Sequence, residues 1–403
     1  MVSSLKSKES LSGPVNLKAY LRFVIKQEAS DLFITAGMPP SLKIDGTVRP
    51  LGDRPLSTQQ VETLVFGVMS PAQRSAFALQ LEANFAIHDH DVGRFRVNVF
   101  RQQNDVGMVI RRIKTDIPTF EELRLPSQFK ELAMAKRGLV IVVGATSTGK
   151  STTLASMVGY RNANSLGHIV TVEDPVEYVH QHRSCIITQR EVGIDTHSFE
   201  NALKNTLRQS PDVIMIGEIR SRETMEHAIA FAETGHLVLT TLHATNANQA
   251  LERIINFFPE DRRQHLLMDL SLNLRAIVAQ RLVPHVSGFG RRVAVEIMLN
   301  TPLVADLIMR GDIYLLRDAM KRSQQGMKAF DHALFELYQN GEISQDEAIH
   351  HADSPNEVRL MIKLGKGITP DLAFAMQGMT LEDERERETS LKPRRFKDPG
   401  ELF

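Results

Sequence analysis

Residues 144–151 read Gly-Ala-Thr-Ser-Thr-Gly-Lys-Ser and follow the apolar run 138–143. Glycines near both ends let the backbone turn tightly, so that successive N–H groups point toward phosphate oxygens. In such a loop Lys150 reaches the β- and γ-phosphates, the Ser151 hydroxyl binds Mg²⁺, and the helix that follows favours an anion at its N-terminus. The spacing predicts a nucleoside triphosphate site, whose binding residues are Gly144, Ala145, Thr146, Ser147, Thr148, Gly149, Lys150, Ser151 and Thr152.

Two acidic segments follow apolar strands elsewhere in the chain. The first contains Glu173, Asp174 and Glu177, and the second has Glu218 after a strand and a glycine. Hydrolysis of a bound nucleotide requires Mg²⁺ to be held beside the loop and a carboxylate to orient the attacking water. Solvated acids at strand ends are the alternative interpretation. Two such segments in a chain with one phosphate loop favour the catalytic one.

Histidines mark two further places. His236 and His243 stand at the two ends of an apolar strand, and their residue type alone leaves a structural and a functional role equally open. His180, His182 and Cys185 have the types of zinc ligands, but a clear fourth ligand is missing from the sequence around them. A zinc site is therefore not favoured.

A group of arginines lies on two strands of the N-terminal region: Arg94, Arg96, Arg101, Arg111 and Arg112. The simple interpretation is an exposed basic face. The alternative is that some of them reach the nucleotide of a neighbouring subunit and neutralise γ-phosphate charge, as arginine fingers do. Arg208, which precedes Gln-Ser-Pro-Asp, is a further candidate for this role.

Composition excludes several classes of protein. In 403 residues, 48 Lys and Arg balance 48 Asp and Glu, so no overall field attracts the chain to nucleic acid or to a membrane surface. A single cysteine rules out an intrachain disulfide, which suits the cytoplasm. The sequence has no apolar run of the length that spans a bilayer and no signal-peptide core, so we expect no direct membrane insertion.

Hydrophobic patterns divide the chain into parts. Helical spacing over 17–25, strands at 31–35 and 41–44, and clean alternation over 93–101 predict a small α+β domain at 1–113. A proline-containing linker follows at 114–127.

Beyond the linker, apolar strands at 138–143, 168–172, 213–216 and 237–242 alternate with helical stretches. This alternation predicts an α/β domain at 128–365 with a largely parallel sheet and ligands at the carboxyl ends of its strands. Helical spacing over 261–281 predicts a helix there, followed by more helical sequence. The segment 366–403 is a charged C-terminal tail.

Taken in order, the phosphate loop, the acidic segment at 173–177, Gly217-Glu218 and the paired histidines resemble the type II/IV secretion ATPases. The segments 93–98, 207–212 and 240–246 resemble, within that family, the type IV pilus retraction ATPases of the PilT/PilU branch. The resemblance covers roughly residues 16–365. It implies a PAS-like N-terminal domain followed by a RecA-like P-loop ATPase domain, assembled into a homo-hexamer.

The resemblance also implies roles for individual residues. Lys150 and Ser151 bind ATP and Mg²⁺, and Glu218 holds Mg²⁺ through water. Glu173, Asp174 and Glu177 form the Asp box, in which Glu177 positions or deprotonates the attacking water. His236 and His243 form the His box, which links the γ-phosphate to movement. The trans-acting arginines are Arg96, Arg111 and Arg208.

Two departures narrow the resemblance. Retraction motors of the PilT type carry Ala-Ile-Arg-Asn-Leu-Ile-Arg-Glu after a Thr-Pro pair, whereas Thr301-Pro302 is followed here by Leu-Val-Ala-Asp-Leu-Ile-Met-Arg. With the charged tail, this favours the accessory motors of the PilU type. The tetracysteine module of many assembly ATPases is absent, which argues against an extension motor.

The resemblance implies a motor that works beside a principal retraction ATPase, recruited from the cytoplasm to an inner-membrane platform protein. A DNA translocase is disfavoured by the zero net charge and the absence of tryptophan. The remaining alternatives are a related DNA-uptake or secretion ATPase and a nucleotide-binding coupling subunit with little activity of its own.

Overall fold

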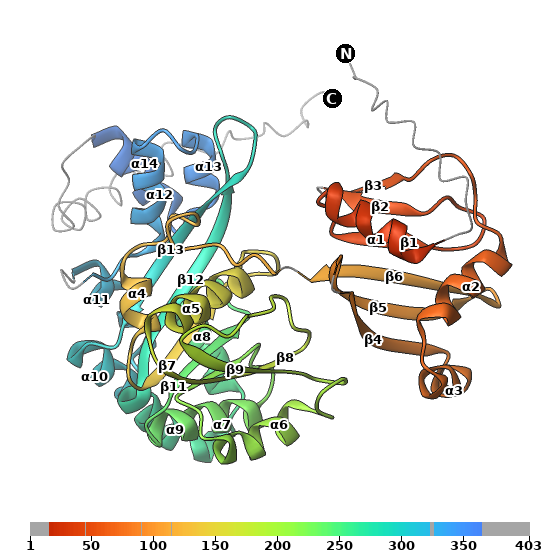
Figure 1. Cartoon of the computed structure of the whole chain (residues 1–403). Helices are drawn as coiled ribbons and strands as arrows, with labels where there is room; N and C mark the ends of the chain where they lie inside the picture. Colours follow the sequence, from red (N-terminus) through yellow and green to blue (C-terminus); the bar gives the residue numbers. More distant parts are fainter. Residues whose placement is uncertain (1–15, 45, 90, 114, 323–325, 365–403) are drawn as a thin grey trace, which may run out of the picture. The chain divides into compact units, whose positions relative to one another are not determined.

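The computed structural model describes residues 16–44, 46–89, 91–113, 115–322 and 326–364 (Figure 1). The chain divides into two compact units, one of residues 1–119 and 158–217 and the other of residues 120–157 and 218–403. No helix within the described ranges is long and apolar enough to cross a membrane. The predicted charged tail, 366–403, lies outside the described residues.

The described residues of the N-terminal region form an antiparallel sheet with three helices, the α+β arrangement that the alternation predicts. Its elements are α1 (Leu17–Lys26), β1 (Asp31–Ile34), β2 (Ser41–Ile44), β3 (Thr47–Pro50), α2 (Thr58–Val68), α3 (Pro71–Gln80), β4 (Glu82–Asp89), β5 (Gly93–Gln102) and β6 (Asp105–Ile113). The strand order is β3-β2-β1-β6-β5-β4.

Buried and partly exposed residues alternate along β5, as expected for a strand with one face on the core. Phe95, Val97 and Val99 are fully buried, as the alternation predicts. Helix α1 buries its predicted apolar face, and the Asn16 side chain caps its N-terminus. Together these residues form one hydrophobic core with the buried side chains of α2 and β6.

The second sheet is largely parallel, as predicted. Its strands are β7 (Gly138–Val143), β8 (Gly167–Glu173), β9 (Cys185–Glu191), β10 (Val213–Ile216), β11 (Leu237–Leu242), β12 (Leu274–Pro284) and β13 (Arg291–Leu299), in the order β13-β12-β7-β11-β10-β8-β9. Strand β7 pairs in parallel with β11 and β12, and β8 pairs in parallel with β9 and β10. Strand β13 pairs antiparallel with β12.

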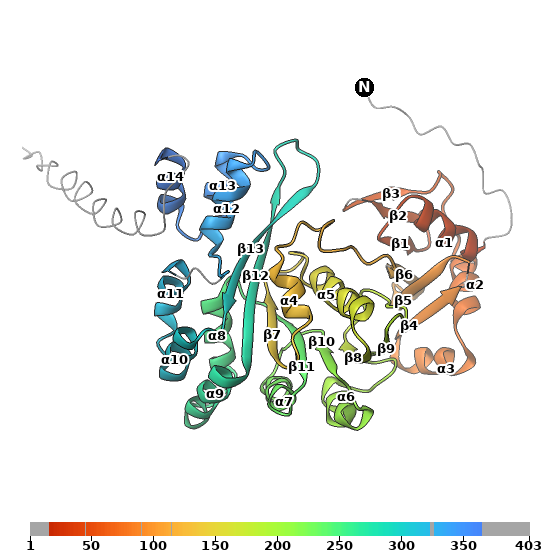
Figure 2. The same ribbon diagram turned by 60° about the vertical axis from the view of Figure 1, so that its left-hand side comes forward.

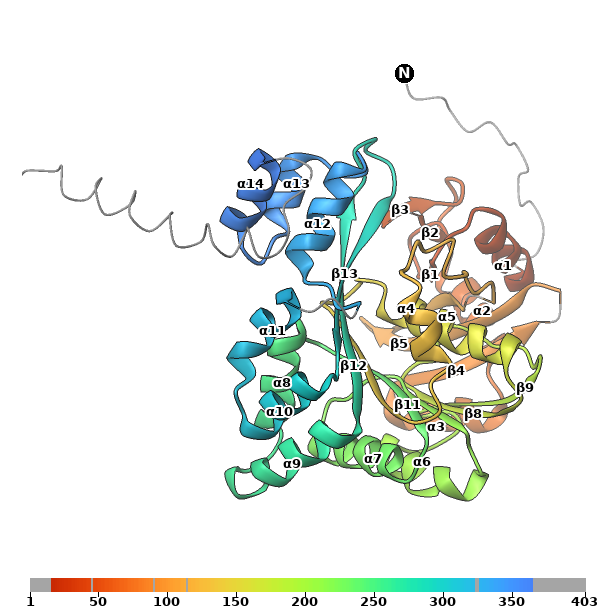
Figure 3. The same ribbon diagram turned by 90° about the vertical axis from the view of Figure 1, so that its left-hand side faces the viewer.

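The helices of this part are α4 (Gln128–Ala133), α5 (Lys150–Asn164), α6 (Phe199–Thr206), the 3₁₀ turn η1 (Leu207–Gln209), α7 (Arg222–Glu233), α8 (Ala247–Asn256), α9 (Glu260–Asn273), α10 (Pro302–Arg310), the 3₁₀ turn η2 (Ile313–Leu315), α11 (Leu316–Arg322), α12 (Phe330–Gln339), α13 (Gln345–His350) and α14 (Pro355–Leu364). Figures 2 and 3 show α4 and α5 on one side of β7 and β12, with α8 and α10 on the other. Helix α12 packs on β13.

The helix predicted over 261–281 is wrong in its second half. Helix α9 ends at Asn273, and the next eleven residues are the strand β12. Leu274 and Ile277 fit helical spacing, but they belong to a nearly continuous apolar run. A strand buried on both faces requires such a run, and β12 lies between β7 and β13. The strand β13 likewise falls in sequence that was expected to be helical.

Candidate functional site

The phosphate loop begins where the fully buried strand β7 ends, and helix α5 begins at its lysine. The backbone is left-handed at Ser147 (φ 63°) and at Gly149 (φ 91°). A Cβ on Gly144 would lie 2.4 Å from the Thr148 hydroxyl and 2.8 Å from the Gln280 carbonyl oxygen. Because a side chain does not fit at this position, Gly144 is what allows the loop to fold back on itself.

Lys150 points back into this loop. Its ammonium donates to the carbonyl oxygens of Gly144 and Ala145, each at 2.8 Å. The residue is only 8% exposed. Burial lowers the pKa of Lys150, and the negative charge of Glu218 opposes that shift. The carboxylate therefore helps to keep a buried cation charged.

A line of contacts connects Lys150 to Glu218 through His243. The Lys150 ammonium lies 3.4 Å from His243 Nδ1, and His243 Nε2 lies 3.1 Å from Glu218 Oε1. Glu218 Oε2 accepts from Arg220 Nε at 2.9 Å. Because an ammonium only donates, Nδ1 of His243 is the acceptor and Nε2 carries the proton toward Glu218. The imidazole thus bridges the phosphate-loop cation and the carboxylate.

His236 is placed differently from His243. It precedes β11, and its carbonyl oxygen accepts from the N–H of Gly138, the first residue of β7. Its Nδ1 lies 3.0 Å from the Thr234 hydroxyl and 3.1 Å from the Phe231 carbonyl oxygen. The phosphate loop follows the carboxyl end of β7, and His243 follows the carboxyl end of the parallel strand β11. The structure therefore brings His243 close to Lys150 and leaves His236 at the opposite end of β11.

The Asp-box segment belongs to the first unit and follows β8. Glu173 is 6% exposed and accepts from the Thr171 hydroxyl at 2.7 Å and from the Gln189 amide at 3.2 Å. Burial raises its pKa to about 7, against the lowering effect of these hydrogen bonds. Asp174 and Glu177, by contrast, are exposed. Of the two glutamates, Glu177 is the one placed to meet water.

The strand β10, which precedes Glu218, runs beside β8, at whose end this segment begins. Ile216 pairs with Val172, and the Gly217 N–H donates to the Val172 carbonyl oxygen at 2.8 Å. A Cβ on Gly217 would lie 3.2 Å from the Cα of Glu173. Glycine at this position therefore permits the close approach of the two acidic segments' backbones before the chain continues to Glu218.

The three candidate arginines lie in the first unit. Arg96 of β5 pairs in register with Arg111 of β6, and Arg111 Nε donates to Asp31 Oδ1 at 2.8 Å. That hydrogen bond raises the pKa of Arg111. Arg208 is exposed on η1. Arg111 is thus fixed in its strand by a buried carboxylate.

Comparison with known proteins gives a consistent result. A family model described as "Type II/IV secretion system protein" matches residues 14–308. The chain belongs to this family. It is 62% identical over 364 residues to a Pseudomonas aeruginosa protein named "Type IV pilus ATPase PilU", covering 90% of this chain and 95% of that one. It is 40% identical to the "Type IV pilus retractation ATPase PilT" of the same organism, over 85% of this chain and 99% of PilT.

A solved member of the family has the same fold. The crystal structure titled "Pilus Retraction Motor PilT and Bound ADP" superposes with a TM-score of 0.81 at 37% identity, over 86% of this chain and all of that one. The prediction of an N-terminal domain followed by a RecA-like ATPase domain is confirmed. The resemblance stated from the motifs is confirmed as well.

Gln189, a residue of β9 that no family motif highlights, holds the Asp-box segment. Besides the amide bond to Glu173, its Nε2 donates to the Tyr178 carbonyl oxygen at 2.9 Å, and its Oε1 accepts from the His180 N–H at 2.7 Å. Gln189 thus connects the start, middle and end of the segment 173–180 by hydrogen bonds. The only signal in the sequence is the polar end, Gln-Arg-Glu, of an otherwise apolar strand.

Substituting Glu173 with glutamine is expected to flatten the pH dependence of stability. The pKa of the buried carboxyl is about 7 in the folded chain, against 4.5 ordinarily. The folded chain therefore binds the proton more tightly than the unfolded one. This contribution is fully present below pH 4.5 and is lost as the pH rises through 7, by about 3 kcal/mol at most.

Urea unfolding followed by circular dichroism between pH 5 and 8 measures this effect. The wild type should lose stability across the range, and Glu173→Gln should lose less. Glu296, whose pKa burial also raises to about 7, provides the matched control: Glu296→Gln should remove a separate part of the same slope. An unchanged slope in Glu173→Gln would contradict the assignment.

Proposed function

We propose that the chain is an ATP-hydrolysing motor that assists type IV pilus retraction. The observation that carries the proposal is the line of contacts from Lys150 through His243 to Glu218 at the end of β7. A bound triphosphate accounts for a cation, an imidazole and a carboxylate placed together at one phosphate loop. The high identity to PilU, over nearly the whole length of that protein, supports the pilus assignment.

Lys150 and the N–H groups of the phosphate loop bind the phosphates of ATP in this proposal. The Ser151 hydroxyl is exposed at the first turn of α5, and Glu218 offers a partly buried carboxylate; hydroxyl and carboxylate oxygens are the ligands that Mg²⁺ prefers. These residues fit the ion. Bound Mg²⁺ would neutralise charge on the phosphates, and Glu218 would hold it through water.

Glu177 orients the attacking water and accepts its proton. Glu173 remains buried behind it, so the two acids of the Asp box have different tasks. His243 links the γ-phosphate to the neighbouring segments, since it contacts both Lys150 and Glu218. Arg96, Arg111 and Arg208 are proposed to act on the nucleotide of a neighbouring copy.

The working assembly is proposed to be a homo-hexamer in the cytoplasm, recruited to a platform protein at the inner-membrane face of the pilus machine. Helix α10 carries the sequence Pro302–Arg310 where PilT-type motors have their own motif. This departure, together with the identity to PilU, supports an accessory motor that acts beside a principal retraction ATPase.

Steady-state ATP hydrolysis by the purified chain, with the mass of the assembly recorded in the same samples, tests the proposal. We expect hexamers that hydrolyse ATP in the presence of Mg²⁺. Supplying the chain to cells that lack it should restore retraction force when the principal motor is present. Hexamers that bind ATP without turnover would overturn the motor assignment and leave a coupling subunit.

A further inference from the structure

Gln280 of β12 lies directly beneath the phosphate loop. Strand β12 is in parallel register with β7 up to Ala279 and Val143. Gln280 therefore lies beside Gly144, the residue that follows β7. Gln280 Nε2 donates to the Thr148 carbonyl oxygen at 2.7 Å. The same nitrogen would lie 3.1 Å from a Cβ on Gly149.

The burial of this amide is unusual, because the other two polar residues of β12, Arg275 and Arg281, are exposed or half-buried. Gln280 is 1% exposed, and its Oε1 has no hydrogen-bond partner among the described residues. A buried amide with one satisfied end costs more than an apolar side chain of the same length would. The favourable interaction at this position is the one with the loop carbonyl. Packing of β12 in the sheet does not require glutamine at this position. A hydrogen bond that holds the phosphate loop in one conformation does require a donor there.

We propose that Gln280 is a positioning residue for nucleotide binding. By holding the Thr148 carbonyl, it fixes the peptide group between Thr148 and Gly149, whose glycine N–H faces the region where phosphates bind in such loops. It touches the loop and not the reacting atoms. Its contribution is therefore to the affinity for the phosphates of ATP and ADP alike.

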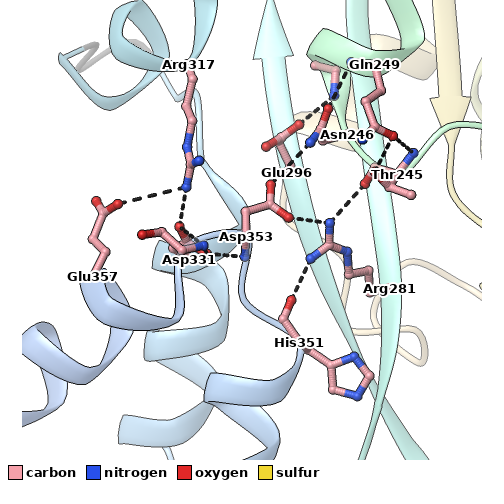
Figure 4. A network of polar contacts seen from close by, with 12 residues as sticks. Thr245, Asn246, Gln249, Arg281, Glu296, Arg317, Asp331, His351, Asp353 and Glu357 are labelled. Carbon is pink, nitrogen blue, oxygen red and sulfur yellow. Dashed lines mark hydrogen bonds and ion pairs between the residues drawn. The ribbon is translucent and has the colours of Figure 1, made fainter. Parts of the chain in front are cut away.

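The next residue, Arg281, shows how β12 itself is held. Successive residues of a strand face opposite sides, so Arg281 points away from the loop. Figure 4 shows its guanidinium between the Thr245 carbonyl oxygen, at 3.3 Å, and the carboxylate of Asp353. The guanidinium also donates to the His351 carbonyl oxygen and lies 4.1 Å from the centre of the Phe330 ring.

These contacts join three parts of the second unit at one strand position. Thr245 follows the His243 segment by two residues, and Asp353 and His351 precede α14. Weakening the Arg281–Asp353 ion pair should therefore loosen β12 next to Gln280 and reduce nucleotide affinity to a smaller extent. The C-terminal helices thereby contribute to a binding site that none of their side chains needs to touch.

Affinity for a fluorescent ADP, together with KM and kcat for ATP, tests the proposal on the full-length chain. Gln280→Met keeps the length of the side chain and removes the donor. We expect its dissociation constant for ADP and its KM to rise about five- to tenfold, the effect of one hydrogen bond, with kcat little changed. Gln280→Glu removes the donor with an isosteric group and should weaken binding at least as much. Asp353→Asn should weaken it about two- to threefold.

Asn300 provides the matched control. It is a partly buried amide beside the same sheet, with Nδ2 bonded to the carbonyl oxygens of Ser271 and Leu274 and with a buried Oδ1 that lacks a partner in the described part of the chain. Asn300→Ala should lower the melting temperature and leave ADP affinity unchanged.

Equal ADP affinity in the wild type and both Gln280 variants would overturn the proposal, whatever their melting temperatures. The proposal depends on the nucleotide site assigned above but not on turnover. Because ADP binding is read without hydrolysis, failure of the motor assignment and failure of the Gln280 assignment give different results.

Discussion

Replacing Glu177 with glutamine is expected to lower kcat for ATP hydrolysis by about 10² to 10⁴-fold, the usual contribution of a positioned general base. Glutamine keeps the size of the side chain and one acceptor oxygen, but it cannot accept the proton of the attacking water. Glu177 is exposed and its side chain packs in no core, so folding should not change. The affinity for ADP and the mass of the assembly should therefore match those of the wild type.

Lys150→Ala separates chemistry from binding in the same assay. Lys150 belongs to the phosphate loop, so its loss should reduce both nucleotide affinity and turnover. Glu177→Gln should reduce turnover alone. Hydrolysis at the wild-type rate by Glu177→Gln would show that another carboxylate orients the water, and Asp174, which is also exposed, would be the next residue to test.

Replacing Asp331 with alanine is expected to reduce the free energy of unfolding by about 2 to 4 kcal/mol. Asp331 is 2% exposed at the start of α12. Its carboxylate accepts from Arg317 at 2.5 Å and from the backbone N–H groups of Asp353 and Ser354 at 2.8 and 3.2 Å (Figure 4). Alanine leaves two backbone donors unpaired in a buried position. The guanidinium is partly exposed and recovers some hydration, which keeps the loss below that of a fully buried pair.

Urea unfolding at constant pH, without nucleotide, measures this loss. Glu336→Ala on the same helix is the control, because the carboxylate of its ion pair with Lys328 is partly exposed, unlike that of Asp331. That change should cost less than about 1 kcal/mol. A similar small loss in Asp331→Ala would mean that the carboxylate is dispensable for docking of α12 and α14.

The parts of the fold that could be predicted from the sequence are those whose hydrophobic pattern fits one type of element only. Strands 138–143, 213–216 and 237–242 are short apolar runs between turn residues, and they lie at the predicted places. The strand β12 was predicted to be helical because an apolar run next to an amphipathic helix satisfies both periods. Only its pairing with β7, which is a contact between distant residues, decides between them.

Some residues of the candidate site could likewise be predicted from local sequence, and others only from the structure. Lys150 and Glu218 follow from local spacing, and the structure brings them together through His243. His236 has the same residue type as His243 and flanks the same strand, yet it stands at the other end of β11. Gln280 could not be found from a motif, because its role depends on strand register across 132 residues of chain.

The only cysteine of the sequence begins β9 and is 3% exposed. Its Sγ donates to the Ser165 carbonyl oxygen at 2.9 Å, and burial raises the pKa of the thiol. A thiol that is both buried and protonated reacts slowly with alkylating reagents. Cys185 is therefore expected to react little with maleimide reagents in the folded chain. A cysteine placed at any exposed position would carry a fluorophore alone, and movements within a working assembly could be followed without first removing a native residue.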